Sequence, residues 1–251
     1  MKLIAPKNVF TKILAEAIGR NEFEVFFCEA SLVSKELEYN TSAVALIPSL
    51  DLINHRELFV SSKVAISFDG MLSNSYLYFK ESERDLEKIA VRGDVSLNEV
   101  ILTKILFSER FSSKAEIVLE PSSKPTKEKD YIIVGDENFS VWNFKNGISF
   151  SDEVSEMLDF PYVNFVFVSS DKDSLNSFHK LVGQIDETIE DKIDTILPNL
   201  NLPDEAKSFI KENLDSLYFQ MTSNETEALN ELIRLLFYHG IIEDLFDMKF
   251  V

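Results

Sequence analysis

Short apolar runs alternate with helix-like patterns along the first half of the chain, and this alternation narrows the choice of fold more than any other feature. Three such runs are predicted strands: residues 1–5, 23–27 and 43–47. Between the first two, Ile13, Leu14 and Ala17 recur at the spacing of one helix face. Strand–helix–strand units of this kind form largely parallel sheets. The run at 43–47 has no polar alternation, which predicts a strand covered on both faces.

The second half continues the pattern and then becomes helical. Strands are predicted at residues 131–134 and 163–168, and the second run carries Asn164 among apolar residues, as expected for a strand that returns through the interior. Gly135 and Asp136 follow the first run, where a chain leaving a parallel sheet commonly turns toward a ligand. Helical spacing dominates from Asp173 onward. The chain is therefore predicted to be an α/β protein with a helical C-terminal region.

Charge and composition exclude several classes of function. The 251 residues carry 25 Lys and Arg against 43 Asp and Glu, a formal net charge of −18. Such a chain repels nucleic acid, because binding to phosphates requires cations. No apolar run approaches the roughly 20 residues needed to span a membrane, and the N-terminus has no secretory pattern. We expect a cytoplasmic protein in which the single cysteine, Cys28, is a buried small hydrophobic residue.

Common catalytic and cofactor motifs are absent. The sequence contains no Gly-x-Gly-x-x-Gly, no Walker Gly-Lys-Ser/Thr, no His-Glu-x-x-His and no Gly-x-Ser-x-Gly. His55, His179 and His239 are far apart in the sequence, and none is a favoured catalytic candidate. We therefore predict neither a metal nor a cofactor.

Short polar residues next to predicted strand ends and helix starts are better candidates for a binding site. One helix is predicted from about Ser96 to Phe107, with Ser96 as N-cap and Glu99 completing a capping box. Hydroxyl and amide groups beside free helix N–H donors suit a ligand that carries a carboxylate. The predicted substrate-binding residues are Ser49, Ser73, Asn74, Ser75, Ser96, Asn98 and Asp136.

Several of these positions lie in segments that resemble one enzyme family. Residues 43–49 read AVALIPS, residues 66–70 read ISFDG and residues 131–137 read YIIVGDE. In this order they resemble the DVALVPS segment, the SSDG loop and the LLIGDEA strand and turn of the chorismate dehydratase family, which serves the futalosine pathway to menaquinone. Residues 153–168 and 232–251 are similar to that family's return strand and last helix.

The resemblance implies a fold and a reaction. The fold is two-lobed and like that of type II periplasmic binding proteins, with mixed, mainly parallel sheets. Lobe one is expected to comprise residues 1–78 and 168–251, lobe two residues 79–167, and the ligand lies between them. The family converts chorismate to an enolpyruvyl-oxybenzoate, which requires removal of a ring proton and departure of hydroxide. Ligand binding is expected to draw the lobes together.

The resemblance also points to the segment after the first strand. Family members carry there a VSYLN motif whose serine and asparagine hold or act on the substrate. Here Lys7 takes the serine position, and Asn8 lies close to the asparagine position but out of register. Lys7 and Asn8 are therefore the predicted catalytic residues. Asp94 beside the predicted helix start opposes an anionic ligand, and Lys7 offsets it.

Four hypotheses follow for the function. The favoured one is a lyase of the chorismate dehydratase type. The main alternative is a non-catalytic protein that binds a small carboxylate ligand between the lobes. A third is a related enzyme acting on a futalosine-derived compound, with His55 as base. A fourth is an interaction protein whose acidic C-terminal helices bind a basic partner. The sequence leaves the oligomeric state open.

Overall fold

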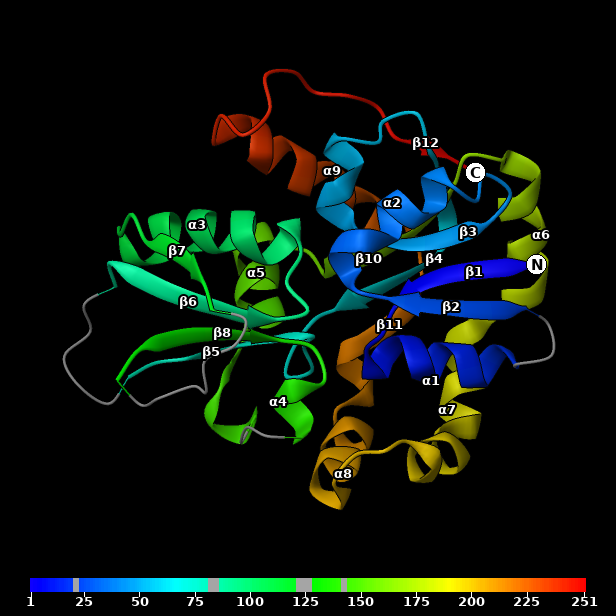
Figure 1. Cartoon of the computed structure of the whole chain (residues 1–251), viewed down its shortest axis with the longest axis horizontal. Helices are drawn as coiled ribbons and strands as arrows, with labels where there is room; N and C mark the ends of the chain where they lie inside the picture. The colour runs from blue at the N-terminus through cyan, green and yellow to red at the C-terminus, as the bar shows by residue number, and fades with distance from the viewer. Residues whose placement is uncertain (20–22, 81–85, 121–127, 141–143) are drawn as a thin grey trace.

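The computed structural model describes residues 1–19, 23–80, 86–120, 128–140 and 144–251, and these form two lobes (Figure 1). Lobe one is built on a seven-stranded sheet in the order β11-β4-β10-β3-β1-β2, with β12 paired to β4. Its strands are β1 (Lys2–Pro6), β2 (Glu24–Cys28), β3 (Val44–Pro48), β4 (Phe59–Phe68), β10 (Tyr162–Ser169), β11 (Leu217–Gln220) and β12 (Lys249–Phe250).

Lobe two is built on a five-stranded sheet in the order β7-β6-β8-β5-β9. Its strands are β5 (Ser75–Tyr78), β6 (Lys88–Gly93), β7 (Glu116–Leu119), β8 (Asp130–Val134) and β9 (Ile148–Ser149). Both sheets are mixed. In lobe one β1 runs parallel to β2 and β3, while β10 runs antiparallel to β3 and β4.

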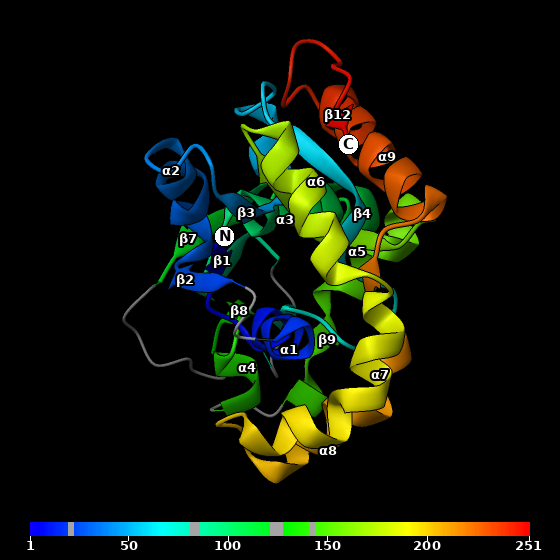
Figure 2. The same ribbon diagram turned by 90° about the vertical axis from the view of Figure 1, so that its right-hand side faces the viewer.

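Helices cover both sheets. Lobe two carries α3 (Leu97–Phe111), α4 (Glu137–Ser140) and α5 (Phe150–Leu158). Lobe one carries α1 (Val9–Ile18), α2 (Val33–Glu38), α6 (Lys172–Val182), α7 (Ile185–Ile196), α8 (Asp204–Glu212) and α9 (Ser223–Tyr238). Figure 2 shows α6 and α7 running along one side of lobe one, with α8 below them. Short 3₁₀ turns, among them η1 (Ala30–Leu32) and η2 (Ser49–Ile53), link several elements. Among the described residues, no helix has the length and apolar character required to cross a membrane.

Local sequence patterns account for the elements nearest the junction of the lobes. All of β3 is buried, as expected for an apolar run covered on both faces. Helix α1 begins after Asn8, whose side chain caps the N–H of Thr11. Helix α3 begins with the predicted capping box of Ser96 and Glu99. The predicted helical C-terminal region is helical apart from β11 and β12, which join the sheet of lobe one.

The chain crosses between the lobes twice, and both crossings come one strand earlier than the predicted boundaries at 78 and 167. Strand β5 belongs to the sheet of lobe two, because it pairs with β8 and β9. Strand β10 belongs to the sheet of lobe one, because it pairs with β3 and β4. The crossings therefore lie between β4 and β5 and between α5 and β10.

The lobes are packed against each other rather than separated. A run of aromatic rings crosses the junction, from Phe68 and Phe10 of lobe one to Phe139 and Phe144 of lobe two, and on to Phe209 of α8. The Phe10 and Phe139 ring centroids are 6.0 Å apart. Burial of rings of this size contributes several kcal/mol to the contact at about 25 cal/mol per Å². The described structure is therefore a closed arrangement of the lobes.

Candidate functional site

A row of buried polar side chains lies across three neighbouring strands of lobe one, at the edge that faces lobe two. Phe165 of β10 pairs with Pro48 of β3, so the antiparallel register brings Asn164 beside Ser49. On the other side, Val163 pairs with Ser67 of β4, and the register shifts before Phe165. Asn164 is thus the extra residue of a β-bulge, a feature that commonly re-aims a side chain near a site.

This row has unused hydrogen-bonding capacity. Ser49, Ser67 and Asn164 are each 0% exposed. Within the described part of the chain, neither hydroxyl and neither end of the Asn164 amide has a hydrogen-bond partner. Buried polar groups are almost always hydrogen-bonded, because an unmade bond costs about 1–3 kcal/mol. This row therefore has hydrogen-bonding capacity that it can offer a ligand.

Two further buried groups extend the row toward the junction. Asn8 of lobe one is 1% exposed and Asn74, between β4 and β5, is 2% exposed. The Asn8 Nδ2 and the Asn74 Oδ1 have no partner among the described residues. The two are linked through a short path, because the Asn74 carbonyl accepts from the Gly135 N–H and the next residue, Asp136, accepts from the Val9 N–H. We call Asn8, Ser49, Ser67, Asn74 and Asn164 the junction site.

Asn98 at the start of α3 joins the two lobes beside this site. Its Oδ1 accepts from the Leu50 N–H at 2.9 Å, and its Nδ2 donates to the Asn164 carbonyl at 2.7 Å. Asn98 is fully buried, and both ends of its amide are engaged. Its side chain therefore fixes the backbone of Asn164 and of Leu50, the residue after Ser49.

Three predicted binding residues, Ser73, Ser75 and Ser96, bond to other protein groups. The Ser73 Oγ contacts the Ser75 carbonyl and lies 2.7 Å from the Ser151 Oγ. The Ser75 and Ser96 hydroxyls donate to the carboxylate of Glu99, over 3.0 Å and 2.7 Å. Burial raises the pKa of Glu99, and the hydroxyl and N–H donors around it oppose that shift. These serines support the turns and the helix start from which Asn74 and Asn98 project.

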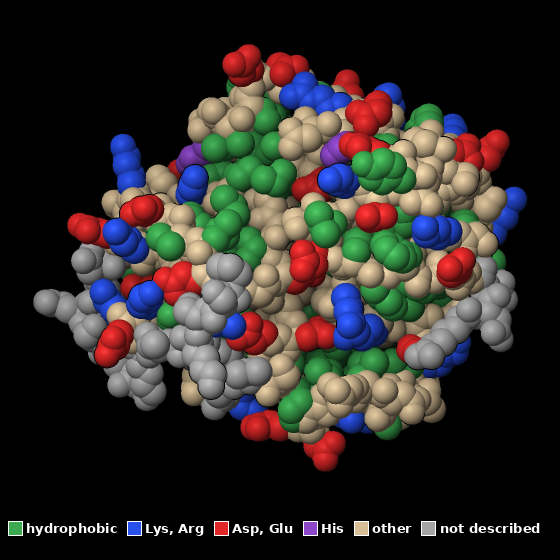
Figure 3. All heavy atoms as spheres, viewed as in Figure 1, with side chains coloured by type: hydrophobic (Ala, Val, Ile, Leu, Met, Phe, Trp, Pro, Cys, Tyr) green, Lys and Arg blue, Asp and Glu red, His purple; other side chains and the backbone are tan. Residues whose placement is uncertain are grey.

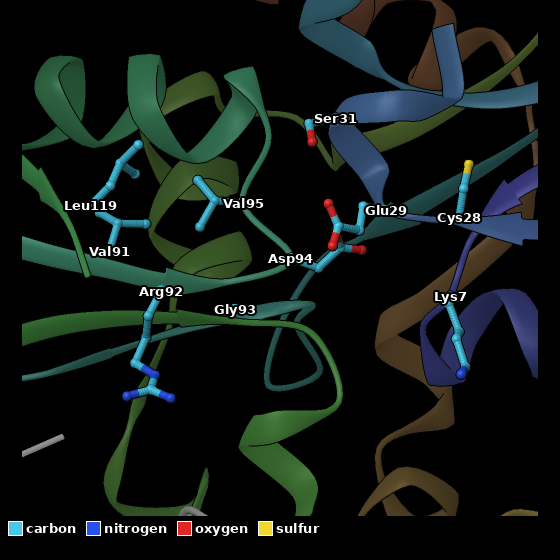
Figure 4. A pocket seen from close by; sticks show the side chains of 10 residues that line it. All are labelled: Lys7, Cys28, Glu29, Ser31, Val91, Arg92, Gly93, Asp94, Val95 and Leu119. Atoms are coloured by element: carbon cyan, nitrogen blue, oxygen red, sulfur yellow. The ribbon is translucent and has the colours of Figure 1, made fainter. Parts of the chain in front are cut away.

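Lys7 and Asp136 line cavities to which both lobes contribute. One cavity of about 690 Å³ is lined by Lys7, Asp94 and an apolar wall of Val91, Val95 and Leu119. Figure 4 shows this wall on the lobe-two side, with Glu29 and Asp94 close together at the centre. Lys7 extends past the start of α1, away from that acidic pair. Lys7 also lines a second cavity of about 770 Å³, together with Asp136.

Two carboxylates of lobe two bond to backbone N–H groups of lobe one. Asp136 accepts from the Val9 N–H at 2.6 Å and pairs with the Lys12 ammonium at 2.5 Å. Asp94 accepts from the Ala30 N–H at 2.8 Å. Burial raises the pKa of Asp94, the Ala30 N–H lowers it, and the nearby carboxylates of Glu29 and Asp136 raise it further. Both contacts bridge the junction, so each favours the closed arrangement of the lobes.

Cys28 is half-buried at the edge of the first cavity, so it is more exposed than the buried small residue that the sequence predicts. It is the last residue of β2, an edge strand of the sheet. Burial and the carboxylates of Glu36, Asp94 and Glu29 raise the pKa of Cys28 to about 11. The thiol is therefore protonated at neutral pH and is a poor nucleophile.

The histidines remain apart. His55 lines a third cavity and lies 3.7 Å from Glu57, His179 bonds Ser61 inside lobe one, and His239 contacts Glu109. Burial lowers the pKa of His179. Within the described ranges, no three His, Cys, Asp or Glu side chains are grouped to hold a metal ion.

Figure 3 shows acidic side chains spread over the visible face rather than gathered in one patch.

The sequence does not assign Asn164 or Ser67 to the site, and it does not identify Lys12 and Glu99 as partners of Asp136 and Ser75. Asn164 had a usable signal, since an asparagine inside an apolar strand is unusual. Glu99 was recognised only as a capping residue. Lys12 carried no signal, because its partner Asp136 is 124 positions away in the sequence.

Comparisons with known proteins identify the fold. No family model and no curated protein matches the sequence. Among solved structures, protein AF1704 from Archaeoglobus fulgidus has a TM-score of 0.62 at 14% identity, covering 96% of this chain and 98% of its own. The Candida albicans CA3427 gene product, described as having the generic periplasmic binding protein fold, has a TM-score of 0.57 at 11% identity, covering 98% and 92%. The periplasmic aliphatic sulphonate binding protein SsuA from Escherichia coli has a TM-score of 0.59 at 8% identity, covering 97% and 88%. The predicted two-lobed, periplasmic-binding-protein-like fold is confirmed.

Proposed function

We propose that the chain binds a small polar molecule at the junction of its lobes, using the junction site. The observation that carries this proposal is the set of buried, unpartnered side-chain atoms contributed by the chain on both sides of the first crossing. They include donors, such as the Asn8 Nδ2, and acceptors, such as the Asn74 Oδ1. A few convergent polar groups within an apolar surround are typical of small-molecule sites. The fold supports the proposal, because SsuA, which shares it, is a binding protein.

A binding role for Asn164 predicts an unusual combination of effects on substitution. In Asn164→Leu, a side chain of similar size removes two unpartnered polar atoms, so the free energy of unfolding is expected to rise by about 1 kcal/mol. Ligand binding is expected to be lost, because the amide no longer meets the ligand. Chemical denaturation measures the first effect. Native mass spectrometry of the purified protein measures the second, as a bound small molecule retained by wild type and absent from the variant.

Asn98→Leu is the matched control. Asn98 is equally buried, but its amide is fully bonded to Leu50 and Asn164. Its substitution is expected to lower the free energy of unfolding by about 2 kcal/mol, because two backbone groups lose their partners. If Asn164→Leu destabilised the protein as much as Asn98→Leu does, Asn164 would be a structural residue and the proposed function would lose its support.

A finer proposal is that the ligand is chorismate and that the chain is a lyase of the chorismate dehydratase type. The sequence resemblance motivates it, and the position of Asn8 supports it. The Asn8 Oδ1 caps α1, which leaves the buried Nδ2 free to donate to a substrate oxygen. Lys7, beside it, lines two cavities along the same junction.

Incubation with chorismate tests the lyase proposal. We expect the dehydrated aromatic product, detected by mass spectrometry, to exceed a control without protein, because chorismate also decays by itself. Asn8→Ser keeps a helix-capping hydroxyl but removes the amide donor, so it is expected to fold normally and to lose product formation by about tenfold or more. A wild-type result equal to the control would refute the lyase proposal and leave the binding role intact.

A further inference from the structure

The start of α1 has the chemistry of a carboxylate receptor. The Val9 N–H is one of the first N–H groups of a ten-residue helix and has no partner within the helix. The Lys12 ammonium lies one turn further along, and the buried Asn8 Nδ2 adjoins them without a partner among the described residues. A backbone N–H at a helix N-terminus together with an ammonium group favours a negative charge.

Asp136 of lobe two already fills this receptor. Its Oδ1 accepts from the Val9 N–H at 2.6 Å, and its Oδ2 accepts from the Lys12 Nζ at 2.5 Å. The carboxylate reaches α1 from across the junction, by way of the turn at Gly135, whose φ of +85° only glycine adopts readily. The two carboxylate oxygens thus make the contacts that a ligand carboxylate would make.

We propose that Asp136 is an internal competitor for this carboxylate position and that it sets the specificity of the junction site. A ligand carboxylate binds at α1 only when Asp136 leaves it, so wild type discriminates against carboxylate ligands. Departure of Asp136 also removes a contact between the lobes. A carboxylate ligand is therefore expected to loosen this edge of the junction, the opposite of the closure expected from the sequence. The ligand specificity in this inference rests on the proposed function, whereas the receptor itself does not.

Acetate rescue of Asp136→Ala tests the receptor without a natural ligand. With Asp136 shortened, acetate is expected to enter the vacated position and to raise the melting temperature in a concentration-dependent way, at ionic strength held constant with chloride. Wild type is expected to show no rise. Asp191→Ala, which removes an exposed carboxylate on α7, is the matched control and is also expected to show none. A rise of equal size in wild type, or no rise in Asp136→Ala, would overturn the proposal.

Chorismate affinity tests the competition, with a second variant that preserves the shape of the side chain. Asp136→Asn still accepts from the Val9 N–H but loses the ion pair with Lys12. By isothermal titration, we expect chorismate to bind Asp136→Ala about tenfold or more tightly than wild type, with Asp136→Asn between them. Equal affinities in all three proteins would overturn the proposal. The proposed function fails separately, through the stability and bound-ligand results for Asn164→Leu.

Discussion

Gly93→Ala is expected to lower the free energy of unfolding by about 4 kcal/mol, because the added methyl group collides with the neighbouring strand. Gly93 ends β6 with a φ of +91°, and a Cβ at this position would overlap the carbonyl oxygen of Val134 on β8. Neither strand can yield easily, because Gly93 pairs with Val134 in the centre of the lobe-two sheet. Chemical denaturation of the purified variant measures the loss.

Gly183→Ala separates the steric effect from the cost of the backbone conformation. Gly183 also has a positive φ, +56°, but nothing lies within 4 Å of an added Cβ. Its substitution is expected to cost about 2 kcal/mol, because a φ of +56° with a ψ of −133° lies in the mirror image of the β region, which essentially only glycine adopts. If the two variants lost equal stability, the contact with Val134 would not be the cause.

The position of Gly93 connects this stability effect to the site. Asp94 follows it directly, and the Asp94 N–H donates to the same Val134 carbonyl at 3.2 Å. Gly135 and Asp136 follow Val134. Forcing β6 and β8 apart at this point therefore displaces both carboxylates that bridge the junction, Asp94 and Asp136. We expect any Gly93→Ala protein that folds to have weakened lobe contacts as well.

Local patterns were sufficient to predict the elements that carry most of the site. The unbroken apolar run of β3 predicted its burial, and the spacing of Ser96 and Glu99 predicted the capping box of α3. These features depend on residues within one strand or one turn, so the sequence displays them directly. Asn8 was singled out differently, from the resemblance of the segment after the first strand to a family motif.

The contacts across the junction could not be predicted, because their partners are distant in the sequence. The pairing of β5 with β8 and β9 moved the first lobe boundary by one strand, and the pairing of β10 with β3 and β4 moved the second. Strand β11 joined the sheet from a region predicted to be helical. The bond from Asp136 to the Val9 N–H joins residues 127 positions apart. No pattern within either segment encodes such a contact, because it arises only when the lobes are assembled.

Asn164 shows how composition and topology combine. The sequence revealed an asparagine in an apolar strand, but a satisfied asparagine would look the same. Only the register of β10 shows that it stands beside Ser49 on one side and near Ser67 on the other. The site was therefore visible in the sequence as separate polar residues, and their convergence required the fold.

Glu99→Ala is expected to lower the free energy of unfolding by about 3 kcal/mol. Glu99 is 1% exposed and accepts from the Ser75 hydroxyl and from both the hydroxyl and the N–H of Ser96. Its removal leaves these three donors without partners in the interior. Glu225→Ala is the matched control, because Glu225 forms the same capping box with Thr222 on α9. In the described part of the chain, it has no contact equivalent to that of Glu99 with Ser75. Its loss is expected to be about 1 kcal/mol.

Glu99 also predicts a dependence of stability on pH. Burial raises its pKa in the folded state above the value in the unfolded chain. Between these two pKa values the folded state binds more protons than the unfolded state. The free energy of unfolding therefore rises as the pH is lowered through this window, and this contribution is lost as the pH rises through the folded-state pKa. Asp94 is shifted in the same direction by burial. Chemical denaturation at neutral pH and near pH 5 measures the stability of wild type and of Glu99→Gln, which cannot titrate. The stability of wild type relative to the variant is expected to be greater near pH 5 than at neutral pH. A difference between the two proteins that stayed constant, or moved the other way, would show that the Glu99 carboxylate is not held at a raised pKa.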